Sequence, residues 1–257
     1  NLSMTQGQLR WRVLCSSPRI MLSDGPIVSA STCKRLIDAA RCAVGAQMPC
    51  SLAANRGQDY RSLPAEACGP GFLAELAASG LISAAAKATG IAARSGEDIM
   101  LARTARLEGA PASRGVLNLH HDRHKRDGRL ATFMINLATV NDGGETFFPA
   151  AGVGEHDPVA RDLRQAFERG ERFVMPTADL ATACERRLHA WREGATGEMG
   201  VGVSALAGTA LWWDSVGGHA QDGAWHSPCL VTGVAAEKFT ITFFKAPPPV
   251  WSSMLLN

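Results

Sequence analysis

This sequence of 257 residues has no long apolar run, little excess of one charge over the other and very little tyrosine. No run of about 18 apolar residues occurs, so no transmembrane helix and no membrane partner are expected. Lysine and arginine number 26 against 24 for aspartate and glutamate, and this net charge of +2 argues against a nucleic-acid partner. The only tyrosine is Tyr60. With 46% hydrophobic and 19% charged residues, the composition is that of a globular protein.

The cysteines lack the spacing of a zinc site. Seven occur and none forms a CxxC pair, which argues against thiolate ligation of zinc. Five precede residue 70, and the sequence leaves open whether they pair in disulfides: Cys15, Cys33, Cys42, Cys50 and Cys68. Residues 1–12 lack the apolar core of a signal peptide, so none is predicted and the compartment stays unknown.

The first 95 residues are predicted to be mostly helical. Ser29–Val44 begins with a capping hydroxyl and then places apolar residues at helical spacing. Residues 72–93 are rich in alanine and leucine and are broken at Gly80 and Gly90, which indicates a pair of helices. Both segments are expected to pack on a larger element that follows.

From residue 98 the pattern changes to short apolar runs separated by Gly, Asp and Pro. The runs begin at Asp98, Val116, Leu130, Ala210 and Phe239 and predict strands of a sandwich or barrel. Because the helices precede the strands and do not alternate with them, a parallel doubly wound sheet is disfavoured.

A single domain over residues 1–257 is expected, with its strand core at 96–248. Residues 150–207 interrupt the core and form a predicted insertion that partly covers one barrel mouth. The segments 161–172 and 180–192 are charged and helical in pattern, and we expect their charges to form a solvated helix face.

The residues of chemical interest begin at His120 and Asp122. On a strand, residues two apart point to the same side, so both side chains can converge on one ion. His226 is the candidate third ligand. Two histidines and one carboxylate on one side of a metal are typical of non-haem Fe(II) oxygenases. The remaining histidines are expected to face away, to face solvent or to be structural: His121, His124, His156, His189 and His219.

A lysine opens the last apolar run. Alternation places Lys238, Thr240, Thr242 and Phe244 on one face, and the opposite face of the strand is purely apolar. A buried ammonium is costly unless it is paired, so an interior Lys238 implies a carboxylate partner. The alternative is a lysine at the strand end that reaches water.

Ordered sequence blocks resemble the prolyl 4-hydroxylase family of Fe(II)/2-oxoglutarate dioxygenases. They read HHD at 120–122, RLATFMINL at 129–137 and NDGGETFFP at 141–149, followed by GTALWW from 208, HSPC from 226 and KFTIT from 238. The resemblance spans most of residues 15–248 outside the insertion. It implies an α+β, mainly β fold: a double-stranded β-helix (jelly-roll, cupin-like) barrel with N-terminal helices packed on its outer sheet.

The resemblance also implies a set of cofactor residues. His120, Asp122 and His226 would ligate Fe(II). Lys238 would pair with the distal carboxylate of 2-oxoglutarate, and Thr146 would donate a hydrogen bond to that carboxylate. Asn136 stands where the family commonly has a tyrosine that lines the cosubstrate pocket. Dioxygen would be the second cosubstrate and ascorbate the reductant.

The substrate side departs from the family pattern. Arg129 stands where the family often has an arginine that faces the substrate groove, and Phe244 stands where it often has tryptophan. Leu117 replaces a usual tyrosine, and no tyrosine occurs between residues 98 and 120. The spacing from His226 to Lys238 is two residues longer than the common pattern.

The implied activity is hydroxylation of a prolyl residue in a peptide or protein, coupled to conversion of 2-oxoglutarate to succinate. The departures leave open another side chain, a free amino acid or a small metabolite as substrate. Two other classes also stay open: a non-catalytic binding module on the same barrel, and a zinc-dependent hydrolase.

Overall fold

The computed structural model describes residues 9–94, 97–110, 115–123, 128–154, 156–171, 173–174, 178–195, 199–215 and 224–247. His124, His219 and the first eight residues of the segment tested for a signal peptide lie outside the described residues.

The strands form open antiparallel sheets. The largest has the order β1 (Trp11–Ser16), β2 (Arg19–Ser23), β10 (Ala210–Asp214), β6 (Ala131–Asn136), β12 (Glu237–Lys245), β4 (Asp98–Arg106) and β3 (Gln58–Pro64). A second sheet has the order β11 (Ser227–Pro228), β7 (Thr146–Phe148) and β9 (Val201–Val203), and β5 (Leu119–His120) pairs with β8 (Phe173–Val174). No sheet closes on itself in the described part of the chain, so the expected barrel is wrong in the sense of a closed sheet. The expected absence of a parallel sheet holds for these pairings.

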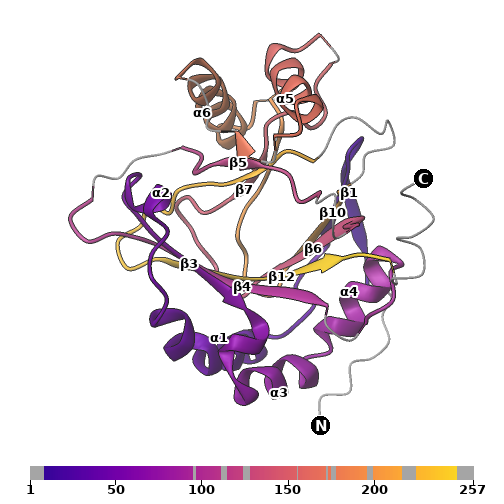
Figure 1. Cartoon of the computed structure of the whole chain (residues 1–257), viewed down its shortest axis with the longest axis vertical. Coiled ribbons are helices and arrows are strands. Elements are labelled where there is room, and N and C mark those ends of the chain that lie inside the picture. The colour runs from indigo at the N-terminus through magenta and orange to yellow at the C-terminus, as the bar shows by residue number, and fades with distance from the viewer. Residues whose placement is uncertain are drawn as a thin grey trace.

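Helices cover one face of the seven-stranded sheet (Figure 1). They are α1 (Ala30–Gly45), the 3-10 helix η1 (Ala65–Cys68), α3 (Pro70–Ala78) and α4 (Leu81–Thr89). The short helix α2 (Ser51–Ala54) lies on the other side of the sheet, where Ala53 packs with Leu117 and Leu230. The Ser29 hydroxyl caps α1 by accepting a hydrogen bond from the Thr32 N–H at 3.1 Å. Gly80 adopts the left-handed conformation that separates α3 from α4. The predicted helices are confirmed, but "mostly helical" is incomplete because β1, β2 and β3 also lie before residue 95.

Alternation along β12 sorts its side chains between two cores. Phe239, Ile241 and Phe243 pack with Leu36 and Phe72 of the helices in the largest apolar cluster. Each such buried side chain contributes about 1.5–3 kcal/mol relative to exposure. The opposite face of the sheet looks toward the three-stranded sheet, and β12 presents Lys238 and its polar neighbours there.

The inner space between the two sheets has its own apolar cluster. Met134 and Trp213 contribute from the large sheet, and Phe148 and Val203 contribute from the small one. The sheets are therefore held together by side chains next to the cavity described below.

Two helices lie on the side opposite α1, α3 and α4 (Figure 1). They are α5 (Pro158–Glu168) and α6 (Ala178–Arg192), and their apolar residues share a cluster with Leu119, Phe147 and Trp225. The predicted helices of the insertion are confirmed. Its boundary is wrong, because β9 belongs to the three-stranded sheet and the inserted segment ends before Val201.

The charges of α6 also differ from expectation. Arg187 pairs with Asp157, and the Arg187 side chain is only 12% exposed. Arg192 pairs with Glu145 with 20% of its side chain exposed. Arg187 therefore joins α6 to the N-cap of α5, and Arg192 joins it to the residue before β7, so neither arginine belongs to a solvated face.

All seven cysteines are free thiols in the structure, so the five early ones form no disulfide. Among the described residues, no helix has the length and apolar character needed to cross a membrane.

Candidate metal centre

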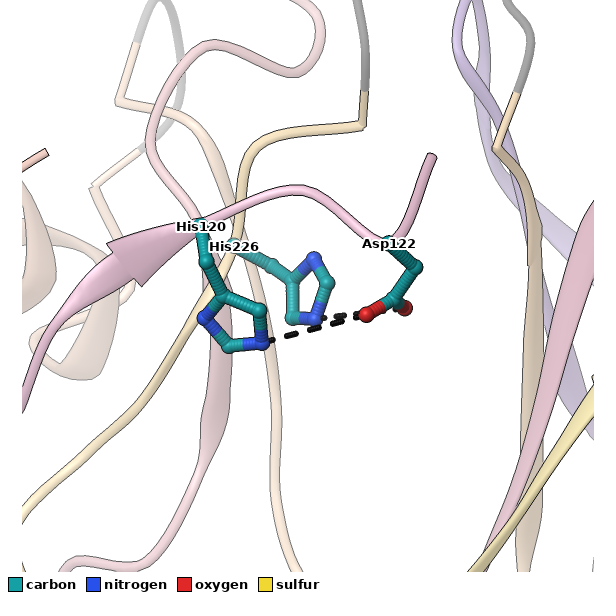
Figure 2. Close-up of side chains that lie close together, drawn as sticks. All are labelled: His120, Asp122 and His226. Carbon is teal, nitrogen blue, oxygen red and sulfur yellow. Dashed lines mark ion pairs between the residues drawn. The ribbon is translucent and has the colours of Figure 1, made fainter. Parts of the chain in front are cut away.

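Three side chains predicted as ligands meet at one point (Figure 2). The nearest oxygens of Asp122 lie 3.9 Å from His120 Nε2 and 3.6 Å from His226 Nε2. One ligand atom from each of the three residues lies within 4.8 Å of the other two. The predicted convergence of distant sequence segments is therefore confirmed.

Backbone pairing brings the two histidines together. The His120 N–H donates to the His226 carbonyl at 3.0 Å, and the His226 N–H donates to the His120 carbonyl at 2.8 Å. This antiparallel bridge places the ring centroids 4.3 Å apart. Asp122 follows β5 on irregular backbone, and Figure 2 shows its carboxylate turned back toward both rings.

The Asp122 carboxylate is buried and yet ionised. Burial raises its pKa, but the positive charge that His226 and His120 carry when protonated, the hydrogen bond from Thr132 and the charge of Arg129 together hold it below its ordinary value. The Thr132 hydroxyl donates to Asp122 Oδ2 at 2.8 Å. The carboxylate is therefore oriented and able to ligate a cation.

The His226 ring is fixed by its own backbone. Its Nδ1 lies 2.8 Å from the Ala224 carbonyl, which accepts a hydrogen bond only if Nδ1 carries the proton. That tautomer leaves the Nε2 lone pair directed at the other two ligands. Trp213 and Phe148 pack on the ring with centroids 4.7 and 5.4 Å away.

The donor set fits a ferrous ion. Two neutral imidazole nitrogens and one carboxylate oxygen on one side of a point form the donor set of non-haem iron oxygenases. The described residues bring no fourth histidine, cysteine or carboxylate to this cluster. His121, the neighbour in sequence, turns away as expected and packs on Phe167 and Trp225 with centroids 5.0 and 4.8 Å distant.

Replacing Thr132 by valine tests the orientation of Asp122. Valine keeps the volume but removes the hydrogen bond to Oδ2, so metal affinity should fall about tenfold, near the lower end for such supporting contacts. Competition with a chelating dye measures the affinity. Thr132→Ser, which keeps the hydroxyl, should bind like the wild type, and equal binding by Thr132→Val would show that the bond has no such role.

The three candidate metal ligands line a cavity of about 470 Å³. Lys238 and Thr146 line the same cavity. Lys238 is 4% exposed, and its Nζ lies 3.4 Å from Thr146 Oγ1. Among the described residues, no carboxylate forms an ion pair with Lys238, so the predicted partner is not supplied by this part of the protein. Burial lowers the pKa of Lys238 to about 8, with Cys229 and Glu145 opposing that shift.

Steric contacts explain why glycine occupies the positions shortly before Thr146. Gly143 has a φ of +82°, and a Cβ there would lie 2.1 Å from the Leu230 carbonyl oxygen. Gly144, with a φ of +71°, donates its N–H to the same carbonyl at 3.1 Å. Only glycine permits this close approach, which sets the entry of β7 beside the segment that follows His226.

The predicted substrate residues also line the cavity and contact each other. The Arg129 guanidinium carbon lies 3.9 Å from the Phe244 ring centroid, and Arg129 forms an ion pair with Asp98. Arg129 is only 8% exposed, so its side chain is not that of a solvated arginine at the start of a strand. Asn136 is buried on the same face of β6 as Thr132, but it is not a lining residue of the cavity. Its Oδ1 has no hydrogen-bond partner among the described residues.

Tyr60 is a cavity residue that the sequence analysis missed. It comes from β3, which pairs with β4 at the sheet edge and places Tyr60 opposite Thr104. Burial raises the pKa of its phenol. Tyr60 precedes the recognised blocks by some sixty residues, so only the strand order could reveal its place. Leu117, which the resemblance aligns with a tyrosine, lines the same cavity.

Comparison with known proteins identifies the fold. No family model and no curated protein matches the sequence. The epimerase SnoN, in complex with Fe3+, alpha ketoglutarate and nogalamycin RO, aligns with a TM-score of 0.53 and 12% identity over 90% of this chain and 80% of that chain.

Two other solved structures align less well. HygX from Streptomyces hygroscopicus with nickel and 2-oxoglutarate has a TM-score of 0.48 and 13% identity, over 91% of this chain and 84% of that chain. Viral collagen prolyl hydroxylase from Paramecium Bursaria Chlorella virus-1 has a TM-score of 0.45 and 16% identity, over 89% of this chain and 96% of that chain. At these identities the similarity shows the fold alone, which this chain shares with an iron- and ketoglutarate-binding enzyme.

Proposed function

We propose that the chain is an Fe(II)/2-oxoglutarate-dependent oxygenase. The observation that carries the proposal is the presence, in one cavity, of the three ligands and the buried ammonium of Lys238. The ligands suit Fe(II), and a buried cation that forms no ion pair with a carboxylate of the described residues suits an anionic cosubstrate. The SnoN structure, which holds Fe3+ and alpha ketoglutarate, supports the pairing of these two ligands in this fold.

The protein residues have separate tasks in this proposal. His120, Asp122 and His226 would hold Fe(II), which supplies the activation of dioxygen. Lys238 and Thr146 would bind the distal carboxylate of 2-oxoglutarate. Trp213 and Phe148 exclude water behind His226. No side-chain general base is required, and ascorbate would serve as the reductant in an assay.

The architecture is consistent with a double-stranded β-helix. We propose that the seven-stranded and three-stranded sheets are the two facing sheets of a jelly-roll, with the cavity between them. Residues 1–257 would then form one catalytic domain. Neither a nucleic acid nor a membrane is a proposed partner.

The first candidate substrate is a prolyl residue in a peptide or protein. Arg129 and Phe244 line the cavity where the family resemblance places a substrate groove. The second candidate is a small molecule, favoured by the loss of the tyrosine at Leu117 and by the nogalamycin RO bound in SnoN. Asn136 remains a proposed cosubstrate residue on the basis of the family resemblance and of a buried oxygen that has no partner among the described residues, although it does not itself line the cavity.

A substrate screen tests this proposal. The protein with Fe(II), 2-oxoglutarate, ascorbate and labelled dioxygen is incubated with a proline-rich peptide library and, separately, with a metabolite pool. We expect succinate to form together with a product that gains one labelled oxygen. Binding of iron without consumption of 2-oxoglutarate in either pool would favour a binding module, and turnover that is independent of 2-oxoglutarate would favour a hydrolase.

A further inference from the structure

An arginine from the inserted segment reaches the loop that carries Thr146. Arg192 ends α6, and its Nε and Nη2 lie 2.8 and 2.7 Å from the two carboxylate oxygens of Glu145. The Glu145 side chain is 10% exposed and that of Arg192 is 20% exposed. This is a two-bond pair in a mostly dry setting, which makes it stronger and more directional than a surface ion pair.

Glu145 is next to the proposed cosubstrate anchor in two ways. It directly precedes Thr146, whose hydroxyl lies 3.4 Å from the Lys238 ammonium. Its carbonyl also accepts a hydrogen bond from the Cys229 N–H at 2.8 Å. The negative charge of Glu145 raises the pKa of Lys238 and so opposes the effect of burial. The Glu145 charge is therefore felt where a carboxylate of 2-oxoglutarate would bind.

We infer that Arg192 is a positioning residue for the cosubstrate: it neutralises Glu145 and orients it away from Lys238. The inference rests on the proposed function of Lys238. Without Arg192, an uncompensated buried carboxylate would repel the incoming carboxylate and attract the ammonium that should bind it. The inserted segment thus contributes to cosubstrate binding without touching the cosubstrate.

A second contact makes the same segment part of the metal site. The backbone of β8 pairs with β5, so that Phe173 lies opposite His120 in the register. The inserted segment therefore contacts the strand of one metal ligand and the loop of the cosubstrate anchor.

Charge-only substitutions test the inference by calorimetric titration of 2-oxoglutarate into Ni²⁺-loaded protein. Arg192→Gln should weaken binding about tenfold, a value within the usual coupling of neighbouring charged groups. The double variant Glu145→Gln/Arg192→Gln should recover most of that loss, because the repelling charge is gone. The affinity for Ni²⁺ should be unchanged in both proteins.

The control is Arg187→Gln, which breaks the ion pair of the same helix with Asp157. It should lower the melting temperature without changing 2-oxoglutarate affinity. Equal weakening in Arg187→Gln and Arg192→Gln would show general damage to the inserted segment and overturn the inference. So would a double variant as weak as the single one, or an Arg192→Gln protein that binds like the wild type. Failure of the wild type to bind 2-oxoglutarate would instead overturn the proposed function itself.

Discussion

His226→Ala should abolish specific metal binding and, with it, all turnover of 2-oxoglutarate. The three ligand atoms lie within 4.8 Å of one another, so the loss of one leaves two donors for the ion. The remaining Asp122 carboxylate would also lose the largest of the charges that lower its pKa. We expect no stoichiometric Fe(II) after gel filtration and no succinate above the protein-free background.

A second histidine variant serves as the control for this experiment. His189 lies on α6 with its side chain 64% exposed, and it pairs only with Glu193 among the interactions described. His189→Ala should bind one Fe(II) and turn over like the wild type. If His226→Ala kept a full equivalent of iron while His189→Ala lost it, the assignment of the centre would be wrong.

Lys238→Ala should weaken 2-oxoglutarate binding by about 1.5–3 kcal/mol, the scale of a hydrogen bond to a charged group. That is roughly a 10- to 150-fold increase in Kd. Lys238 is fully enclosed, and its only neighbour within hydrogen-bonding distance among the described residues is the Thr146 hydroxyl. A neutral replacement therefore removes the ammonium from that position, while metal affinity should not change. An unchanged Kd for 2-oxoglutarate would remove Lys238 from this role.

The same lysine predicts a pH dependence of binding. Its pKa is lowered to about 8 by burial, so the free protein carries the ammonium below pH 8 and loses it above. A bound carboxylate would stabilise the ammonium and raise that pKa. Affinity should therefore fall about tenfold per pH unit above 8, until the pKa of the complex is reached.

Lys238→Arg provides the comparison, because a guanidinium stays charged throughout this range. Its affinity, even if lower overall, should be flat between pH 8 and about 9.5 when measured by the same calorimetric titration. A flat profile for the wild-type protein would contradict the assignment of the ammonium as the binding group.

The sequence was informative where local pattern and chemistry coincide. Strand alternation alone places Lys238 and Phe244 on the polar face of β12, and the structure agrees. The spacing of His120 and Asp122 predicts that both side chains meet at one ion, and the cluster with His226 confirms this convergence. The expected reason, alternation along a strand, is wrong, because β5 ends at His120 and Asp122 reaches the cluster from irregular backbone. Apolar periodicity likewise predicts α1 with Ser29 as its cap.

The features that the sequence did not predict depend on strand order and on pairing between residues far apart in the chain. Tyr60 enters the cavity because β3 lies beside β4, an order that no local pattern contains. Val201 joins the small sheet through pairing with Phe148, so the insertion boundary was misplaced. The sequence pattern of a helix face that is exposed to water is the same as that of a face whose charges pair with a buried carboxylate. The pattern therefore does not predict the pairing of Arg192 with Glu145.

The most direct test is a crystal structure of the protein grown with Ni²⁺ and 2-oxoglutarate. We expect the metal on His120, Asp122 and His226, with the keto acid at the metal and its far carboxylate on the ammonium of Lys238. A metal held by other residues, or 2-oxoglutarate bound away from Lys238, would contradict the proposal that these groups form one site.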